Sequence, residues 1–330
     1  MKELKASVVK NGLGDKTMKA GARLPIVALS AILLLTEGGY GEVFCRDLIV
    51  GAWNIQWLGK PWKRSWIGKN VPQKAEDIAG YVKASKVQLL ALEEICGDGA
   101  IPGNPTNETL DAVIGMLNEG TGASWTYRLF PKRKPDDGEQ HTGLMWNAKI
   151  VTAVGEPFRI AVKVPPQEPD KPFHWKRWPH AMKFSAGEGK TDFVIIPVHM
   201  KSNSSGKEAA KRQRAEEAEQ LTEALKDVKN RFSDSDIVII GDTNVLESTE
   251  DAVKTYVKAG FKDLNAGDEP TMAMGSAPFD RAFVTVNQPE LSRRKVRVFR
   301  PDWLTPMQFR KDLSDHYMVT IKIGIQPDDD

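Results

Sequence analysis

The sequence is poor in the residues that build compact zinc sites and disulfide frameworks. Its 330 residues include only two cysteines and five histidines, and no H-x₃-H or C-x₂-C spacing occurs. A zinc site is therefore disfavoured, because zinc usually takes histidine and cysteine ligands at such short spacing. A chain of this length can still bury a large core without disulfides or metals.

Strong charge bias and internal repeats are also lacking. The net charge is only +2, which decides nothing about a nucleic-acid partner, because a local basic patch can be hidden in a neutral total. No repeat and no linker long enough to split the chain is found, so we expect a single main domain.

The uncharged run LPIVALSAILLLT at 24–36 is too short to cross a bilayer as a helix, which takes about 20 apolar residues. Six basic residues precede it and EGGYG follows, in the order of a secretory signal. We predict a leader at 1–41, a domain at 42–326 and a polar tail at 327–330. The protein would then be secreted or periplasmic, without stable membrane association after removal of the signal. No clean A-x-A marks the cleavage position, Met18 is an alternative start, and a helix packed on the domain is an alternative to the leader.

The two cysteines are not expected to pair. Cys45 precedes the apolar run DLIVGAWN, and Cys96 follows VQLLALEEI. If these runs form parallel strands, the cysteines lie at opposite ends of the sheet, roughly 28 Å apart. That separation is far beyond disulfide reach.

Short apolar runs alternate with polar segments after residue 45, and three of these segments hold amphipathic helical patterns. Helices are predicted at 75–85, 108–119 and 207–230, from apolar residues at helical spacing. Strands are predicted at 48–55, 87–95, 126–130, 143–147, 150–154, 158–164, 180–186, 192–200, 237–244, 279–286, 295–300 and 317–323, and the four between residues 126 and 164 are expected to be joined by hairpins. Many strands with few helices favour an α/β fold of two stacked sheets with helices outside.

Polar residues end or open many of these apolar runs. The set comprises Asn54, Glu93, Glu94, His199, Asp242, Asn244, Asp280, Asp315 and His316. A single aspartate in such a position is more often a turn or a cap than a ligand. So many together indicate a site, because ligand sites in α/β layers gather at strand ends.

The residue types in this set suit a hard cation. Glu94, Asp242 and Asp315 offer carboxylate oxygens, and Asn54 and Asn244 offer amide oxygens. Such ligands favour Mg²⁺, or alternatively Mn²⁺ or Ca²⁺. Histidines beside a site of this kind point to acid–base work rather than ligation.

Six motifs occur in an order that resembles the endonuclease/exonuclease/phosphatase superfamily, the DNase I-like proteins. They are WNIQWLG (53–59), ALEEI (91–95), PVHMKS (197–202), GDTN (241–244), FDRAFV (279–284) and SDHYMV (314–319). The resemblance covers about 46–324 and implies a four-layer α/β/β/α sandwich, with two stacked mixed or mostly antiparallel sheets and outer helices. It also implies metal-dependent hydrolysis of phosphate esters at one end of the sheets.

The resemblance assigns roles to individual residues. Asn54, Glu94, Asp242 and Asp315 match metal-site positions, whereas His199, Asp242, Asn244, Asp280 and His316 match catalytic positions. Family members usually read Gln-Glu where this chain reads Glu93-Glu94, so Glu93 either adds negative charge or points away.

The mechanism expected from these roles begins with His316, oriented by Asp280, which would take a proton from the attacking water. His199 and Asn244 would stabilise the phosphate or protonate the leaving oxygen, and Asp242 is a rival for water activation.

The motifs identify fewer candidates for substrate binding than for metal binding and catalysis. RWPHAMKF (177–184) resembles the strand in which relatives carry a phosphate-contacting arginine, so Arg177 is a candidate, with a solvated loop arginine as the alternative. Gln140 and His141 could lie near the site, and Tyr127 could match a family tyrosine.

The favoured function is a secreted endonuclease acting on nucleic acid, with DNA favoured over RNA and no obligate protein partner. Basic segments at 132–134, 175–178, 211–214 and 293–297 support this, although they could simply be solvated faces. Without residues 1–41 the chain has 40 basic and 41 acidic residues, which is little positive charge for a non-specific DNA binder. A sphingomyelinase is disfavoured because no lipid-inserting apolar hairpin is present. A phosphomonoesterase on a sugar or inositol phosphate and a non-catalytic phosphate-binding protein remain the alternatives.

Overall fold

The computed structural model describes residues 47–67, 71–97, 105–132, 139–163, 175–291 and 295–328. The predicted leader and Cys45 lie outside these ranges, as do residues 164–174 and parts of two basic segments. The cleavage position and the absence of a Cys45–Cys96 bond therefore stay predictions. None of the helices in the described ranges has the length and apolar character that crossing a membrane requires.

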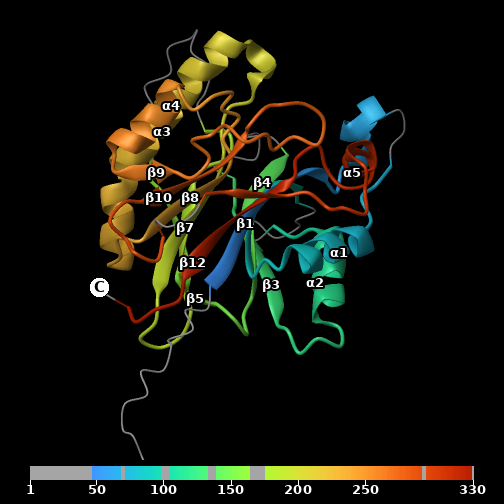
Figure 1. Ribbon diagram of the computed structural model, residues 1–330, viewed down its shortest axis with the longest axis horizontal. Helices are drawn as coiled ribbons and strands as arrows, with labels where there is room; N and C mark the ends of the chain where they lie inside the picture. The colour runs from blue at the N-terminus through green and yellow to red at the C-terminus, as the bar shows by residue number, and fades with distance from the viewer. Residues whose placement is uncertain are drawn as a thin grey trace, which may run out of the picture. The chain divides into compact units, whose positions relative to one another are not determined.

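Two six-stranded mixed sheets form the centre of the domain (Figure 1). The first has the order β11-β12-β1-β2-β4-β3 and the second β5-β6-β7-β8-β10-β9. The strands of the first are β1 (Asp47–Leu58), β2 (Leu89–Cys96), β3 (Trp125–Leu129), β4 (Gln140–Asn147), β11 (Arg297–Phe299) and β12 (Met318–Gly324). Those of the second are β5 (Thr152–Arg159), β6 (His180–Ser185), β7 (Asp192–His199), β8 (Ile237–Asp242), β9 (Phe261–Asp263) and β10 (Asp280–Thr285).

Helices cover the outer faces of both sheets (Figure 1). The helices α1 (Ala75–Ser85) and α2 (Glu108–Asn118) pack on the first sheet, and α3 (Lys207–Phe232) and α4 (Asp251–Lys258) pack on the second. The short helices η1 (Pro61–Ile67), η2 (Asn203–Ser205) and α5 (Pro306–Asp312) lie in connections. The predicted four-layer α/β/β/α sandwich is confirmed.

The alternation of β7 shows why a continuous apolar run forms a central strand. Phe193 and Ile195 belong to the core cluster between the sheets, whereas Val194, Ile196 and Val198 belong to the cluster beneath α3 and α4. A strand covered on both faces needs apolar residues at every position. Such strands are rigid, so their ends are suitable places for a site.

Several predicted elements differ from the structure. The strands expected at 150–154 and 158–164 are one strand, β5, with a register irregularity between Val154 and Phe158. β4 and β5 lie in different sheets and are therefore not a hairpin. The helices α4 and α5 and the strand β9 were not predicted, although Thr305 and Gln308 form a capping box at the start of α5.

Candidate active site

Strand direction brings the predicted site residues to one edge of the two sheets. Asn54 on β1 pairs with Glu93 on the parallel strand β2, and His199 on β7 pairs with Asp242 on the parallel strand β8. β10 runs antiparallel to β8, so its first residue, Asp280, also pairs with Asp242. Residues far apart in sequence meet here because parallel strands end, and antiparallel strands begin, at the same edge.

Hydrogen bonds to the backbone fix the segment before β12 beside β1. The indole Nε1 of Trp53 donates to the carbonyl of His316 at 2.8 Å. The hydroxyl of Ser314 donates to the carbonyl of Asn54 at 2.5 Å and accepts from the backbone N–H of His316 at 3.1 Å. The segment LSDHY is thus held in place as part of the site.

Glu94, His199 and Asp242 form the first cluster, with donor atoms that all lie within 4.8 Å of one another. The Nε2 atom of His199 is 3.5 Å from Asp242 Oδ2 and 3.8 Å from Glu94 Oε1. The amide nitrogen of Asn54 donates to the same two oxygens, at 3.0 and 3.2 Å. Both carboxylates therefore point at one position.

A β-bulge turns Glu94 toward that position. The register between β1 and β2 shifts after Asn54, and Glu94 has a φ of +60°. The backbone N–H of Trp57, itself at a φ of +57°, donates to Glu94 Oε2 at 3.1 Å. Strained backbone of this kind is often found at functional sites, where the surrounding fold holds it.

Asp280 and His316 form a buried dyad next to the first cluster. The Nδ1 atom of His316 is 2.9 Å from Asp280 Oδ2, and Asp280 is fully buried. The other ring nitrogen, Nε2, lies 3.9 Å from Asp242 Oδ2. A single carboxylate therefore orients the ring so that Nε2 faces the first cluster.

The two histidines titrate in opposite directions. Burial lowers the pKa of His199 well below its ordinary range, and the charges of Arg177 and His316 lower it further. Burial also disfavours the charged form of His316, but Asp280 and Asp242 outweigh it and raise the pKa of His316 well above its ordinary range. Burial therefore favours the neutral imidazole of His199, whereas the neighbouring acids favour the protonated form of His316; a cation bound at the first cluster would lower the pKa of His316 and free its Nε2 atom to accept a proton.

The acidic side chains fit a divalent cation. Burial raises the pKa of Asp242 to about 7 and raises the pKa of Glu94, because two buried carboxylates without a counterion resist ionisation. Carboxylate oxygens of this spacing are suited to Mg²⁺ or Mn²⁺. His199 lies within reach as a third group.

Glu93 points between the sheets instead of into the cluster. It is fully buried, and neither of its carboxyl oxygens has a hydrogen-bond partner within the described ranges. Its Oε1 would be 2.7 Å from a Cβ at Gly241, so only glycine fits there. Burial, Asp280 and Asp242 raise the pKa of Glu93 well above its ordinary range. Its surroundings therefore favour the neutral form of Glu93, which adds no negative charge to the site.

Asn244 and Asp315 adjoin the cluster without bonding to it through their side chains. Asn244 donates its backbone N–H to Asp242 Oδ1 at 2.9 Å and its side-chain amide to the carbonyl of Met200 at 3.2 Å. The charge of Asp315 raises the pKa of Glu94 and of His316. It does not join the acid and histidine groups that could hold an ion within the described residues.

The predicted substrate residues divide into two groups. Arg177 donates to the side-chain oxygen of Gln140, and its charge lowers the pKa of Glu94, so both lie at the site. Tyr127 lies elsewhere, because its hydroxyl donates to Asp111 on α2 at 2.7 Å. Its place in β3, at the far edge of the first sheet, explains this separation.

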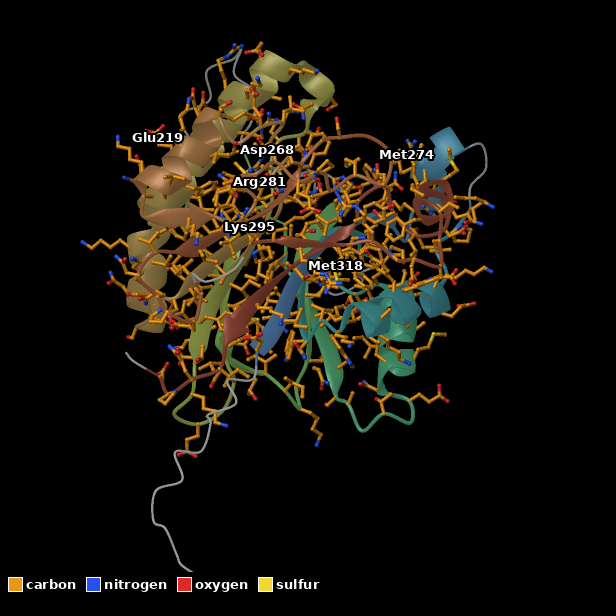
Figure 2. All side chains as sticks on the ribbon, viewed as in Figure 1. Glu219, Asp268, Met274, Arg281, Lys295 and Met318 are labelled. Atoms are coloured by element: carbon orange, nitrogen blue, oxygen red, sulfur yellow. The ribbon has the colours of Figure 1, made fainter. Side chains whose placement is uncertain are left out.

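Two buried arginines stabilise segments next to the site, and the sequence motifs did not identify this role. Arg281 donates to Asp263 at 2.6 Å and to Asp268, which fastens the loop after β9 to β10. Figure 2 shows Arg281 and Asp268 close to each other. Arg214 on α3 makes a two-pronged contact with Glu250, with bonds of 2.8 to 3.0 Å. Both form only when the fold brings separate segments together, so no local sequence signal reveals their partners.

Comparison with known proteins shows which solved structures share this fold. No protein-family model and no curated protein matches this chain. Among solved structures, an endonuclease/exonuclease/phosphatase family protein from Bacteroides thetaiotaomicron matches with a TM-score of 0.56 and 16% identity. The match covers 87% of this chain and 100% of that one.

Two further solved structures are similar to the same extent. A mannosyl-6-phosphatase from Bacteroides thetaiotaomicron matches with a TM-score of 0.55 and 16% identity, covering 84% of this chain and 99% of that one. TDP2 from D. rerio, solved with a single-strand DNA product, matches with a TM-score of 0.51 and 15% identity, covering 85% and 99%. At such low identity these matches show a shared fold.

Proposed function

Because this chain has the fold of the endonuclease/exonuclease/phosphatase superfamily, we propose that it is a divalent-metal-dependent phosphoric ester hydrolase. The observation that carries the proposal is the Glu94–His199–Asp242 cluster beside the Asp280–His316 dyad. Two acids that converge on one point next to an oriented histidine match the needs of phosphate-ester hydrolysis. A protein that only binds phosphate has no need of the dyad.

The proposed chemistry uses each group according to its position. A divalent cation held by Glu94 and Asp242 would offset the charge on the phosphate and polarise the scissile bond. His316 accepts the proton of the attacking water at Nε2, while Asp280 holds the opposite ring nitrogen. Asp242, 3.9 Å from the same Nε2 atom, is the rival acceptor.

His199 and Arg177 are proposed to stabilise the phosphate during the reaction. Positive charge and hydrogen-bond donors placed before the reaction stabilise the extra negative charge of the five-coordinate phosphate. Arg177 is held by Gln140, and the Nε2 atom of His199 faces the carboxylates of Glu94 and Asp242. We therefore assign Nε2 as the nitrogen of His199 that would meet a bound phosphate.

Our preferred substrate is a nucleic-acid phosphodiester, with DNA preferred over RNA, and we propose Mg²⁺ as the ion. The similarity to TDP2 bound to a DNA product supports this choice, as do the basic residues around Arg177. The similar mannosyl-6-phosphatase supports a phosphomonoesterase as the second candidate. We also propose a secreted or periplasmic location, because the first 41 residues have the order of a secretory signal.

The test is hydrolysis of plasmid DNA and of bis-p-nitrophenyl phosphate by the purified protein with Mg²⁺, Mn²⁺, Ca²⁺ or EDTA. Asp242→Asn should abolish metal-dependent nicking and the rise in melting temperature that Mg²⁺ produces. Asp251→Asn, an exposed acid at the start of α4, is the matched control and should change neither. Activity on phosphomonoesters alone would favour the phosphatase, and stabilisation by Mg²⁺ without any turnover would favour a binding protein.

A further inference from the structure

A pocket of about 200 Å³ opens next to the proposed catalytic cluster. His199 lines it together with Lys176, Arg177 and Lys201, and its other lining residues include Trp57 and the acids Glu139 and Glu217. We call it the lysine pocket. Because His199 also belongs to the cluster with Glu94 and Asp242, a group in the pocket would lie beside a phosphate bound at that cluster.

The pocket is rich in uncompensated positive charge. Lys176 and Lys201 form no ion pair with any residue that the structure describes, and Lys176 is exposed. Burial, Lys176 and Arg177 together lower the pKa of Lys201, although Glu217 acts against them. Cations that crowd one another in this way are stabilised by a bound anion.

The two acids that line the pocket are occupied by other partners. Glu217 accepts from the backbone N–H groups of Lys201, at 2.9 Å, and Trp175, at 3.3 Å, and burial raises its pKa to about 7. Glu139 pairs with Lys60 at 2.5 Å. Among the residues that the structure describes, neither acid therefore forms an ion pair with Lys176 or Lys201.

The backbone of the pocket is built rigidly. Besides the bond to Glu217, Lys201 accepts from Arg214 through its carbonyl at 3.0 Å, so α3 holds it on both sides. Trp57 adds an aromatic wall and is fixed by its bond to Glu94. Aromatic walls next to cations are typical of sites for single nucleic-acid strands.

We propose that the lysine pocket binds the phosphate that neighbours the scissile phosphodiester on one side, with Lys176 and Lys201 as its ligands. This inference rests on the proposed function. The pocket is smaller than the roughly 300–1,000 Å³ of sites for drug-sized ligands, so it accepts a phosphate with part of its sugar. The preferred substrate is therefore a nucleic-acid strand with at least two consecutive phosphates.

The experiment compares TpT, which has one phosphodiester, with pTpT and TpTp, which carry an additional phosphate on one side. Two charge-assisted hydrogen bonds predict that one of the two phosphorylated forms has a kcat/KM about ten- to a hundredfold higher than TpT. In Lys176→Ala/Lys201→Ala this ratio should fall to within about threefold of unity. The single variant Lys176→Ala, at an exposed position, should lower it in part.

Lys190→Ala is the matched control, because Lys190 is exposed and precedes β7, whereas Lys201 follows it. It should keep the full ratio. The inference is overturned if the unmodified protein shows a ratio near one, or if the double variant keeps the ratio of the unmodified protein. In both cases, turnover of TpT still upholds the proposed function. If the unmodified protein hydrolyses none of the three diesters, the proposed function itself is refuted. The protein could instead hydrolyse glucose 1,6-bisphosphate but not pTpT, and lose that activity in the double lysine variant. This result would assign the pocket to a small bisphosphate and overturn the inference of a nucleic-acid strand as substrate.

Discussion

The Asp280–His316 dyad allows a graded prediction about rate. His316→Ala removes the proposed proton acceptor, and general acid–base groups typically contribute 10²–10⁴-fold. Asp280→Asn keeps a hydrogen-bond acceptor 2.9 Å from Nδ1 but removes the charge. Hydrogen bonds to charged groups contribute about 1.5–3 kcal/mol, against about 0.5–1.5 kcal/mol for neutral ones.

The difference of about 1–2 kcal/mol corresponds to a loss of roughly five- to thirtyfold in kcat/KM for Asp280→Asn. Asp280 acts through the His316 ring, so the double variant should be no slower than His316→Ala alone. The loss of Asp280's charge should also shift the part of the pH–rate profile that depends on His316 to lower pH, because this carboxylate raises the pKa of His316.

The assay is kcat/KM on bis-p-nitrophenyl phosphate between pH 5 and 9, with melting temperatures recorded for every variant. Near-normal turnover by His316→Ala would remove that residue from the mechanism. If the losses of the two single variants multiply in the double variant, Asp280 acts independently of the ring and the dyad is not a functional unit. If the pH–rate profile of Asp280→Asn coincides with that of the unmodified protein, the titrating group is not His316.

Three further predictions concern stability. Arg214→Met leaves the fully buried carboxylate of Glu250 unpaired, and it should lower the free energy of unfolding in urea by about 3–5 kcal/mol; a loss below 1 kcal/mol would show that this pair is dispensable. Burial and a hydrogen bond with Glu290 raise the pKa of Asp236 from 3.8 to about 9, so the folded state keeps a proton that the unfolded state releases, and stability falls as the pH rises between these values. Asp236→Asn should therefore raise the melting temperature at pH 8 and leave it unchanged at pH 4, and a destabilisation at both would contradict the reasoning. Gly241→Ala should prevent stable folding, because its Cβ would lie 2.2 Å from a backbone oxygen of β7 and the residue has a φ of +145°; a soluble variant with a wild-type melting temperature would refute this.

The positions of the candidate catalytic residues could be predicted because they depend on local patterns. Apolar runs such as VIIPVH and IVIIGD predict buried strands, and the polar residue at the end of each must lie at a sheet edge. His199, Asp242, Asp280 and His316 were all found in this way, and the order of motifs added their expected roles. Spacing in sequence is sufficient here because strand direction fixes which ends meet.

The surroundings of these residues could not be predicted in the same way. Tyr127 was expected near the site, but its hydroxyl contacts Asp111 on α2. The role of Glu93 was left open by the sequence, and its burial beside Asp280 and Asp242 raises its pKa and so favours the neutral form. Charge and hydrogen-bonding state depend on neighbours from distant segments, which no local pattern specifies.

The sequence by itself determined the layered class of fold, the set of acids and histidines and their meeting at one edge, since these follow from periodicity and strand direction. Only the tertiary structure decided which nitrogen of His316 faces the cluster and which residues line the lysine pocket. Lys176, Lys201 and Glu217 come from two loops and a helix on the second sheet, and Trp57 comes from the first. Their proximity results from the packing of whole layers, and that packing is the sum of many long-range contacts.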